Sequence, residues 1–225
     1  MEALQRARAS HPDCEIIVID NASIDNTVGV VRNFFSAVEI FANPGNPGFA
    51  AAVNQGAAIS NGRMLLLLNP DTIVHEDFFS TLDAFIERTP QAGIIGCNML
   101  DHLGSHQPSC WKNASIWTAL LEAVLPYNLS SRLVTDNPVQ ASEVDMVSGG
   151  CMCIRKEIFE ALKGFDERFF MYYEDSDFCL RAKESGCKIF FLPDPRVRRS
   201  RARANSPGST PEWPLRPWSG TKRAI

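Results

Sequence analysis

Two carboxylates in this sequence follow apolar runs that are typical of buried strands, and this position suits ligand chemistry. Asp20 ends the run Glu15–Asp20, and Asp71 follows shortly after the run Met64–Leu68. In an α/β sheet, ligands bind at the carboxyl ends of the strands. We therefore expect Asp20 and Asp71 to line one cleft.

Asp71 could hold a hard divalent cation, because such ions take oxygen ligands. The ion would act as a Lewis acid and neutralise a diphosphate leaving group. Alternatively, Asp71 caps a following helix or forms an Asx turn after Pro70. Asp20 could accept hydrogen bonds from the base of a nucleotide, or it could only complete a turn at the strand end. The spacing leaves these alternatives open.

A third group of acids, Glu174, Asp175 and Asp177, begins a predicted helix behind an aromatic run. Glu174 and Asp177 are spaced to pair with Arg181, which leaves Asp175 beside bulky aromatic residues. A carboxylate near apolar rings has a raised proton affinity and can act as a general base. The structural alternative is that all three acids favour the positive end of the helix dipole.

Strands and helices alternate along the chain and predict an α/β fold, with a mostly parallel sheet flanked by helices. We expect strands at Glu15–Asp20, Val38–Ala42, Met64–Leu68, Ala92–Met99, Glu143–Ile154 (broken at Gly149-Gly150) and Cys187–Leu192. We expect helices at Thr27–Ser36, Ala50–Ser60, Glu76–Arg88, Ile116–Leu125, Arg155–Leu162 and Glu174–Ser185.

The loop between the second strand and the next helix is rich in Pro and Gly. Its glycines, Gly45 and Gly48, would let the backbone approach a phosphate or a sugar. The loop lacks the G-x-G-x-x-G spacing of dinucleotide-binding proteins. A nicotinamide oxidoreductase is therefore a weak alternative.

The bulk properties fit one globular domain, since the chain has 225 residues, of which 45% are hydrophobic. No apolar run reaches the roughly 20 residues that span a bilayer, so a cytoplasmic location is expected. Residues 196–225 hold eight Lys/Arg and one Glu, whereas the rest of the chain is acidic. We expect a helix or loop at 1–14, one domain at 15–195 and a disordered basic tail at 196–225. The acidic body predicts no nucleic-acid partner. The basic tail leaves peripheral contact with a membrane open.

Four segments together resemble the family-2 glycosyltransferases, and within them the rhamnosyltransferase-like branch. They are IIVIDNASIDNT from Ile16, NPGNPGFAAAVNQG from Asn43, LLLLNPDT from Leu65, and the long stretch DMVSGGCMCIRKEIFEALKGFDERFFMYYEDSDFCLRAKESGCKIFFLP from Asp145. This resemblance implies a Rossmann-like GT-A fold, a nucleotide-diphosphate sugar donor, and Mg²⁺ or Mn²⁺ as cofactor.

The resemblance also assigns roles to residues. The donor-binding set would be Asp20, Asn21, Asp25, Asn46, Asn54 and Asn69, with Asp71 as the metal ligand. Asp175, with Glu174 beside it, would be the catalytic base, and Asp166 and Glu167 would lie near the acceptor. The implied reaction inverts the anomeric centre and moves a sugar, rhamnose at family level, onto a glycan or lipid-linked acceptor in polysaccharide or glycolipid synthesis.

The sequence departs from the family pattern in three places. The family's first strand is missing before Glu15, so a gap is expected beside the Glu15–Asp20 strand. The metal motif has one carboxylate, as Asn69-Pro70-Asp71, in place of Asp-x-Asp. Arg198 and Arg199 stand where a metal-binding His is usual. These departures predict a chain truncated at both ends, with impaired activity.

Two further alternatives follow from the departures. The chain could be a catalytically inactive homologue that binds a nucleotide or a sugar without turnover. It could also be a fragment that assembles as a homo-oligomer, in which a neighbouring copy covers the open sheet edge.

Overall fold

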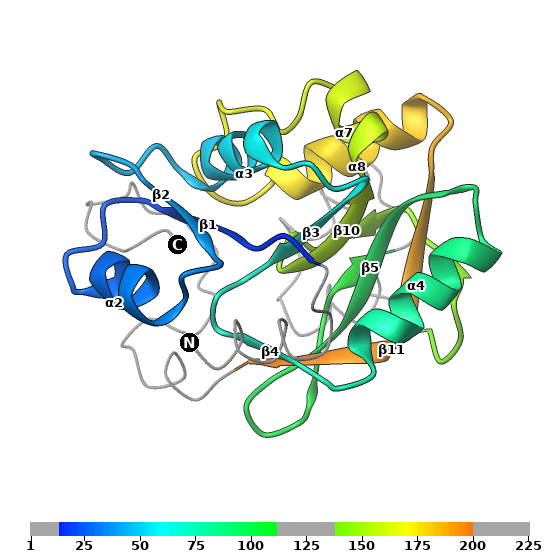
Figure 1. The fold of residues 1–225 in the computed structure, drawn as a ribbon. Helices are drawn as coiled ribbons and strands as arrows, with labels where there is room; N and C mark the ends of the chain where they lie inside the picture. The colour runs from blue at the N-terminus through cyan, green and yellow to red at the C-terminus, as the bar shows by residue number, and fades with distance from the viewer. Residues whose placement is uncertain (1–13, 112–137, 200–225) are drawn as a thin grey trace, which may run out of the picture.

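A computed structural model describes residues 14–111 and 138–199 of the chain. These residues form an α/β fold in which helices cover both faces of a central sheet (Figure 1). The fold class predicted from the sequence is thus confirmed. The predicted segment 1–14 apart from its last residue, the helix near Ile116–Leu125 and the tail from residue 200 onward lie outside the described residues.

The N-terminal part contains a small sheet of two parallel strands. The elements of this part are β1 (Ile17–Asp20), α2 (Thr27–Phe34), β2 (Glu39–Ala42) and α3 (Phe49–Ile59), and β1 and β2 form the sheet. β1 pairs with β2 from Ile17 opposite Glu39 to Asp20 opposite Ala42. In the described part of the chain, β1 and β3 belong to different sheets. Among the described strands, β1 therefore pairs with β2 alone, and the predicted absence of a strand before Glu15 falls mostly on residues outside the described part.

The central sheet has the strand order β3-β10-β5-β11-β4. These strands are β3 (Met64–Leu68), β10 (Cys151–Arg155), β5 (Ala92–Leu100), β11 (Lys188–Arg199) and β4 (Thr72–Val74). Two short strands complete the central sheet: β6 (His106–Gln107) pairs with β5, and β8 (Ser142–Glu143) pairs with β11. A separate sheet is formed by β7 (Cys110–Trp111) and β9 (Met146–Val147).

The sheet is mixed in direction, so the prediction of a mostly parallel sheet is wrong in this respect. β5 and β11 run parallel, but β10 is antiparallel to both of its neighbours and β4 is antiparallel to β11. Antiparallel neighbours therefore outnumber the one parallel pair along this strand order.

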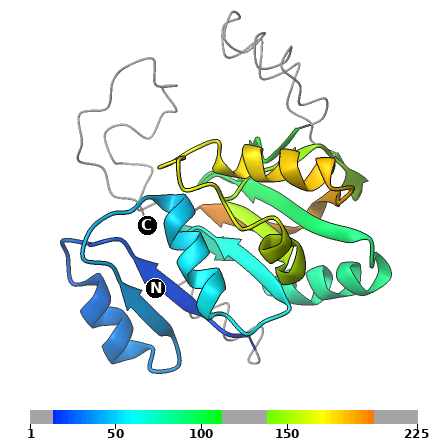
Figure 2. The same ribbon diagram turned by 90° about the horizontal axis from the view of Figure 1, so that it is seen from above.

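Two apolar layers enclose this sheet. Along β5, Ile94 packs toward α3, α7 (Lys156–Ala161) and α8 (Glu174–Glu184), whereas the next residue, Ile95, packs toward α4 (Phe78–Arg88). Figures 1 and 2 show α3, α7 and α8 on one face and α4 on the other. All nine residues of β5 are buried, which makes this strand the centre of the core.

β11 is longer than predicted, because it continues past two prolines to Arg199. Its register against β5 jumps from Leu192 opposite Cys97 to Arg196 opposite Asn98. The bulge between them absorbs Pro193 and Pro195, which is where a sheet tolerates proline. The strand thus continues four residues beyond the predicted domain end at 195 and pairs with β4.

Candidate functional site

The turn Gly149–Gly150 brings together elements that are far apart in sequence. The Gly149 N–H donates a hydrogen bond of 2.9 Å to Oδ2 of Asp175, at the start of α8. The Asn69 N–H donates to the Gly150 carbonyl over 3.1 Å, at the end of β3. A Cβ on Gly149 would lie 3.5 Å from both Asp175 and the ring of Phe49, at the start of α3. Three elements therefore meet at this turn.

The backbone before α8 is strained. Tyr172 and Tyr173 have φ of 69° and 71°, in the left-handed region that side chains other than glycine rarely adopt. Such residues cost roughly 1–3 kcal/mol each and cluster at functional sites. Both side chains are also exposed, by 65% and 51%. This turn presents Glu174 and Asp175 at the start of the helix.

Asp175 is held on both sides by hydrogen bonds. Its Oδ2 accepts from Gly149 and its Oδ1 accepts from the Ser176 N–H, at 2.9 and 2.8 Å. Burial nevertheless raises the pKa of Asp175, because protein atoms crowd the carboxyl group and these bonds offset only part of the desolvation.

Glu174 is more deeply placed, with only 5% of its surface exposed. Burial, and then the charge of Asp175, raise the pKa of Glu174 to about 7. The expected ion pair with Arg181 is formed by Asp177, at 2.8 Å. Among the described residues, Oε2 of Glu174 has no hydrogen-bond partner. Glu174 is therefore buried, and the ion pair with Arg181 is made by Asp177.

Asp71 lies in the short link between β3 and β4, directly before β4. It precedes a strand, so the alternative that it caps a helix is wrong. Its side chain is 9% exposed, and Oδ2 lies 3.6 Å from Nε of Arg199. The pairing of β4 with β11 sets this contact, because Arg199 lies opposite Thr72.

The residues around Asp71 do not fit the expected divalent metal. In residues 14–111 and 138–199, no three His, Cys, Asp or Glu side chains are grouped to hold an ion. An ion on Asp71, at about 2.1 Å, would lie within about 6 Å of the Arg199 guanidinium. The repulsion is roughly 5 kcal/mol at an effective dielectric constant of about 20. The Arg199 guanidinium thus lies beside Asp71, where the sequence predicted a cation.

Asp20 and Asn21 lie at the end of β1, as predicted, and both are buried. Oδ2 of Asp20 accepts a bond of 3.0 Å from the Ser23 N–H. Asn21 donates to the Gly48 carbonyl at 3.2 Å and accepts from Asn43 at 2.9 Å. Asn21 therefore ties the end of β1 to the glycine-rich loop.

The glycine-rich loop docks on the segment before α8. Phe49 N–H donates to the Phe170 carbonyl at 2.9 Å. Gly48 has φ of 96°, and a Cβ there would lie 2.5 Å from the Phe170 oxygen, so only glycine fits. Asn46 closes this loop by accepting from the Gly48 N–H at 3.0 Å.

Asp25 is exposed before α2. It accepts a bond from the Thr27 N–H at 3.0 Å and another from the Thr27 hydroxyl. These contacts support the start of the helix, so the structure places Asp25 in a local turn.

Asn54 and the predicted acceptor-side residues form one network. Asn54 donates to the Phe165 carbonyl and to Glu167, and it accepts from the Phe165 N–H, each at 2.9 Å. Asp166 binds Arg168, whose hydrogen bonds lower the pKa of Asp166 to about 2. This geometry favours a role for Asn54 in positioning residues 164–167 over direct contact with a donor.

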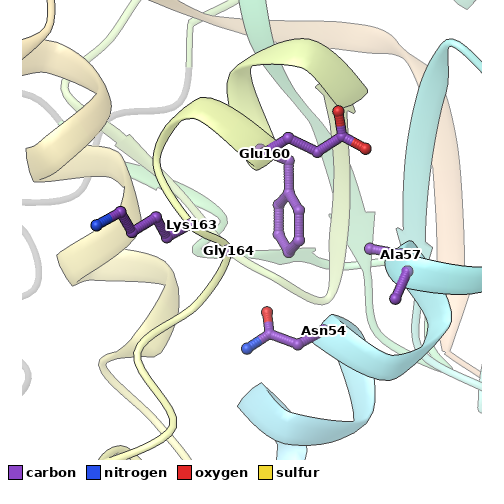
Figure 3. A pocket seen from close by; sticks show the side chains of 7 residues that line it. Asn54, Ala57, Glu160, Lys163 and Gly164 are labelled. Atoms are coloured by element: carbon purple, nitrogen blue, oxygen red, sulfur yellow. The ribbon is translucent and has the colours of Figure 1, made fainter.

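A shallow pocket lies between α3 and α7, lined by Asn54, Ala57, Ala58, Phe159, Glu160, Lys163 and Gly164 (Figure 3). Its volume of about 240 Å³ is below the roughly 300–1,000 Å³ of small-molecule sites. In Figure 3, the Lys163 side chain extends away from Asn54 and Ala57. The pocket does not include the carboxylates at the Gly149–Gly150 turn or at Asp71.

Sequence reasoning missed the contribution of Gly149–Gly150, Phe49 and Arg199. The paired glycines were visible as a break in a predicted strand, and Arg199 as a departure from the family pattern. Nothing local in the sequence indicates that these residues contact Asp175 and Asp71, because each contact joins elements distant along the chain.

Comparisons with known proteins identify the family and the fold. The family described as glycosyltransferase like family 2 matches residues 2–210. An N-acetylglucosaminyl-diphospho-decaprenol L-rhamnosyltransferase of Mycobacterium tuberculosis is 28% identical over 212 residues, covering 86% of this chain and 69% of its own length. The rhamnosyltransferase WbbL of Escherichia coli (strain K12) is 29% identical over 130 residues, or 57% of this chain and 49% of its own.

Solved structures with a similar fold include a mannosyltransferase from Pyrobaculum calidifontis in complex with GDP-Man and Mn²⁺. It gives a TM-score of 0.63 at 17% identity, covering 91% of this chain and 53% of its own. GalNAc-T7 with UDP, GalNAc and Mn²⁺ gives 0.62 at 19% identity, covering 83% of this chain and 37% of its own. These likenesses establish the GT-A fold. Among the described residues, no helix is long and apolar enough to cross a bilayer.

Proposed function

We propose, from the premise that this chain belongs to glycosyltransferase family 2, that it transfers a sugar from a nucleotide-diphosphate donor to an acceptor hydroxyl with inversion. One observation carries the proposal. The glycine turn that contacts the end of β3 also donates a hydrogen bond to Asp175, so the strand end and the carboxylate are fixed together.

Asp175 is the proposed general base. It removes the proton of the acceptor hydroxyl, whose oxygen bonds to the anomeric carbon as the bond to the diphosphate breaks. The leaving nucleoside diphosphate takes the bonding electron pair, and Asp175 keeps the proton. The raised pKa of Asp175 supports this role, because a base of higher proton affinity removes a hydroxyl proton more effectively.

Glu174 assists by remaining largely protonated below about pH 7. Its pKa is raised by burial and then by the negative charge of Asp175, so the two carboxyl groups influence each other's protonation. The exposed rings of Tyr172 and Tyr173 lie directly before the pair. They offer flat apolar surface to a sugar of the acceptor.

The donor side is proposed at the ends of β1 and β3. Asp20 and Asn69 are proposed as donor-binding residues because they lie at those strand ends. Asn21 and Asn46 hold the glycine-rich loop through hydrogen bonds to Gly48. Asp25 remains a prediction for the outer part of this side. Asp166 and Glu167 are proposed on the acceptor side, where Asn54 holds their loop.

The relatives suggest the substrates. One is named for rhamnosyl transfer to N-acetylglucosaminyl-diphospho-decaprenol, and another, from Shigella flexneri, is a dTDP-rhamnosyl transferase at 24% identity. We propose dTDP-rhamnose as the donor and a lipid-linked diphospho-sugar as the acceptor. Such an acceptor implies work at a membrane surface.

The test is release of dTDP by the full chain from dTDP-rhamnose, with and without a lipid-linked acceptor. Asp175→Asn should lower kcat by about 100-fold or more, because general-base catalysis contributes roughly 10²–10⁴ in rate. Glu143→Gln is the matched control, since this exposed carboxylate pairs with Lys188 at 3.0 Å. Equal rates for wild type and Asp175→Asn would contradict the proposal.

A further inference from the structure

We propose that Arg199 holds the donor diphosphate beside Asp71, so that donor binding by this chain needs no divalent cation. This inference rests on the proposed function, because it assumes a nucleoside-diphosphate donor at the end of β3. It concerns only which group of the protein neutralises the negative charge of that diphosphate.

The backbone of Arg199 is fixed by strand pairing on two sides. The end of β11 pairs with β4, with Val197 opposite Val74 and Arg199 opposite Thr72. It also pairs with β5, with Val197 opposite Met99. Val197 and Thr72 are fully buried. The start of the Arg199 side chain is therefore held by the core, which limits the directions that its guanidinium can take.

The contact with Asp71 orients the guanidinium of Arg199 but leaves its Nε without a hydrogen bond among the described residues. Nε lies 3.6 Å from Oδ2, close enough for an ion pair but beyond a good hydrogen bond. Nε is buried, and in the described part of the chain it has no hydrogen-bond partner. Since 36% of the side chain is exposed, the group can reach an anion that arrives from solvent.

Arg199 differs from the two arginines beside it. Arg196 is exposed and pairs with Asp194 at 2.8 Å. Arg198 is exposed and lies opposite Ile73, and successive side chains of a strand point to opposite faces. Of these three arginines, Arg199 is the one that pairs with Asp71. The proposed diphosphate site therefore depends on the position of Arg199 beside Asp71, and not on the number of basic residues in this segment.

The chemistry suits a diphosphate. A guanidinium stays charged at any physiological pH and presents five N–H donors in a planar fork that binds phosphate oxygens bidentately. A charged donor aimed at the departing diphosphate also stabilises the charge that develops there as the sugar leaves. Asp71 then acts as a positioning residue, because it touches the guanidinium.

The decisive experiment is calorimetric titration of the full chain with dTDP and with UDP, in EDTA and in Mn²⁺. We expect the better of the two nucleotides to bind in EDTA within about threefold of its affinity in Mn²⁺. Arg199→Gln should weaken that binding by at least about tenfold in EDTA, which corresponds to losing one charge-assisted contact. Arg199→Lys should fall between the two, since it keeps the charge but loses the fork.

Two further variants complete the design. Arg196→Gln is the matched control and should bind like wild type. Arg199→His removes the fixed charge and adds an imidazole beside Asp71, so binding by this variant should become stronger when Mn²⁺ is added. Circular dichroism of each variant checks that it folds. If Arg199→Gln does not fold, the comparison of wild type in EDTA and Mn²⁺ and the Lys variant still decide.

The outcomes separate this inference from the proposed function. Wild-type binding that vanishes in EDTA, with Arg199→Gln unchanged in Mn²⁺, would overturn the role of Arg199 and leave the glycosyltransferase proposal intact. No binding of either nucleotide under any condition would overturn both.

Discussion

Asp175 at the start of α8 and Asp71 directly before β4 lie in different electrostatic surroundings. Asp175 has a second carboxyl beside it, in Glu174, and burial raises the pKa of both. Asp71 has a guanidinium 3.6 Å away instead. The first region therefore contains two carboxyl groups of raised proton affinity, and the second contains a carboxylate paired with a guanidinium. Under the proposals above, Asp175 would serve proton transfer and Arg199 would serve the neutralisation of the diphosphate.

The first prediction sharpens this comparison through pH. The pKa of Glu174 is raised to about 7 in the folded chain, from 4.5, so the folded state binds the proton more tightly than the unfolded state. Its contribution to stability is complete below about pH 4.5 and is lost as the pH rises to about 7. The loss amounts to about 3 kcal/mol at 1.36 kcal/mol per pKa unit.

Glu174→Gln should therefore reduce the fall in the free energy of unfolding between pH 5 and pH 8, as measured by urea denaturation. Glu143→Gln serves as the surface control. An unchanged pH profile in the Glu174 variant would show that this carboxyl is not held in the protonated form by burial.

The second prediction tests whether the glycine-rich loop must dock on the acid-bearing region. Gly48→Ala should destabilise the chain by about 2 kcal/mol, because alanine is strained at φ of 96° and would meet the Phe170 carbonyl. Gly45→Ala is the matched control in the same loop, since a Cβ there meets nothing within 4 Å. Thermal unfolding of both variants provides the measurement, and equal melting temperatures would argue against the docking.

The third prediction concerns the strain before α8 and has the smallest expected effect. Tyr172→Gly should remove the cost of the left-handed backbone, stabilising the chain by about 1 kcal/mol when the lost side-chain contacts are small. Turnover should fall at the same time, since the exposed ring is lost. A variant that is less stable than wild type would indicate that the ring contributes more than the strain removes.

Local patterns predicted the elements of this fold well. Met64–Leu68 was predicted with its observed bounds, because a continuous apolar run between polar ends is typical of a buried strand. β4 was missed, since three residues, Thr72–Val74, carry too short a pattern. The end of β11 was missed because Pro193 and Pro195 normally end a strand, whereas here a bulge accommodates them.

The site was harder to predict than the fold. Asp20 and Asp175 lie where strand-end and helix-start reasoning put them, since those rules depend on neighbouring residues. The side chain of Asn54 instead binds Phe165 and Glu167, more than 100 residues away. The contact of Asp71 with Arg199 likewise depends on the register between β4 and β11, which no local pattern contains.

One kinetic comparison tests the separation of roles most directly, with Asp175→Asn and Arg199→Gln assayed side by side on dTDP-rhamnose in EDTA. The account predicts that Asp175→Asn lowers kcat by about 100-fold or more while dTDP binds within about threefold of wild type. It predicts that Arg199→Gln weakens dTDP binding by about tenfold or more. Both variants losing nucleotide binding and kcat to the same extent would contradict it.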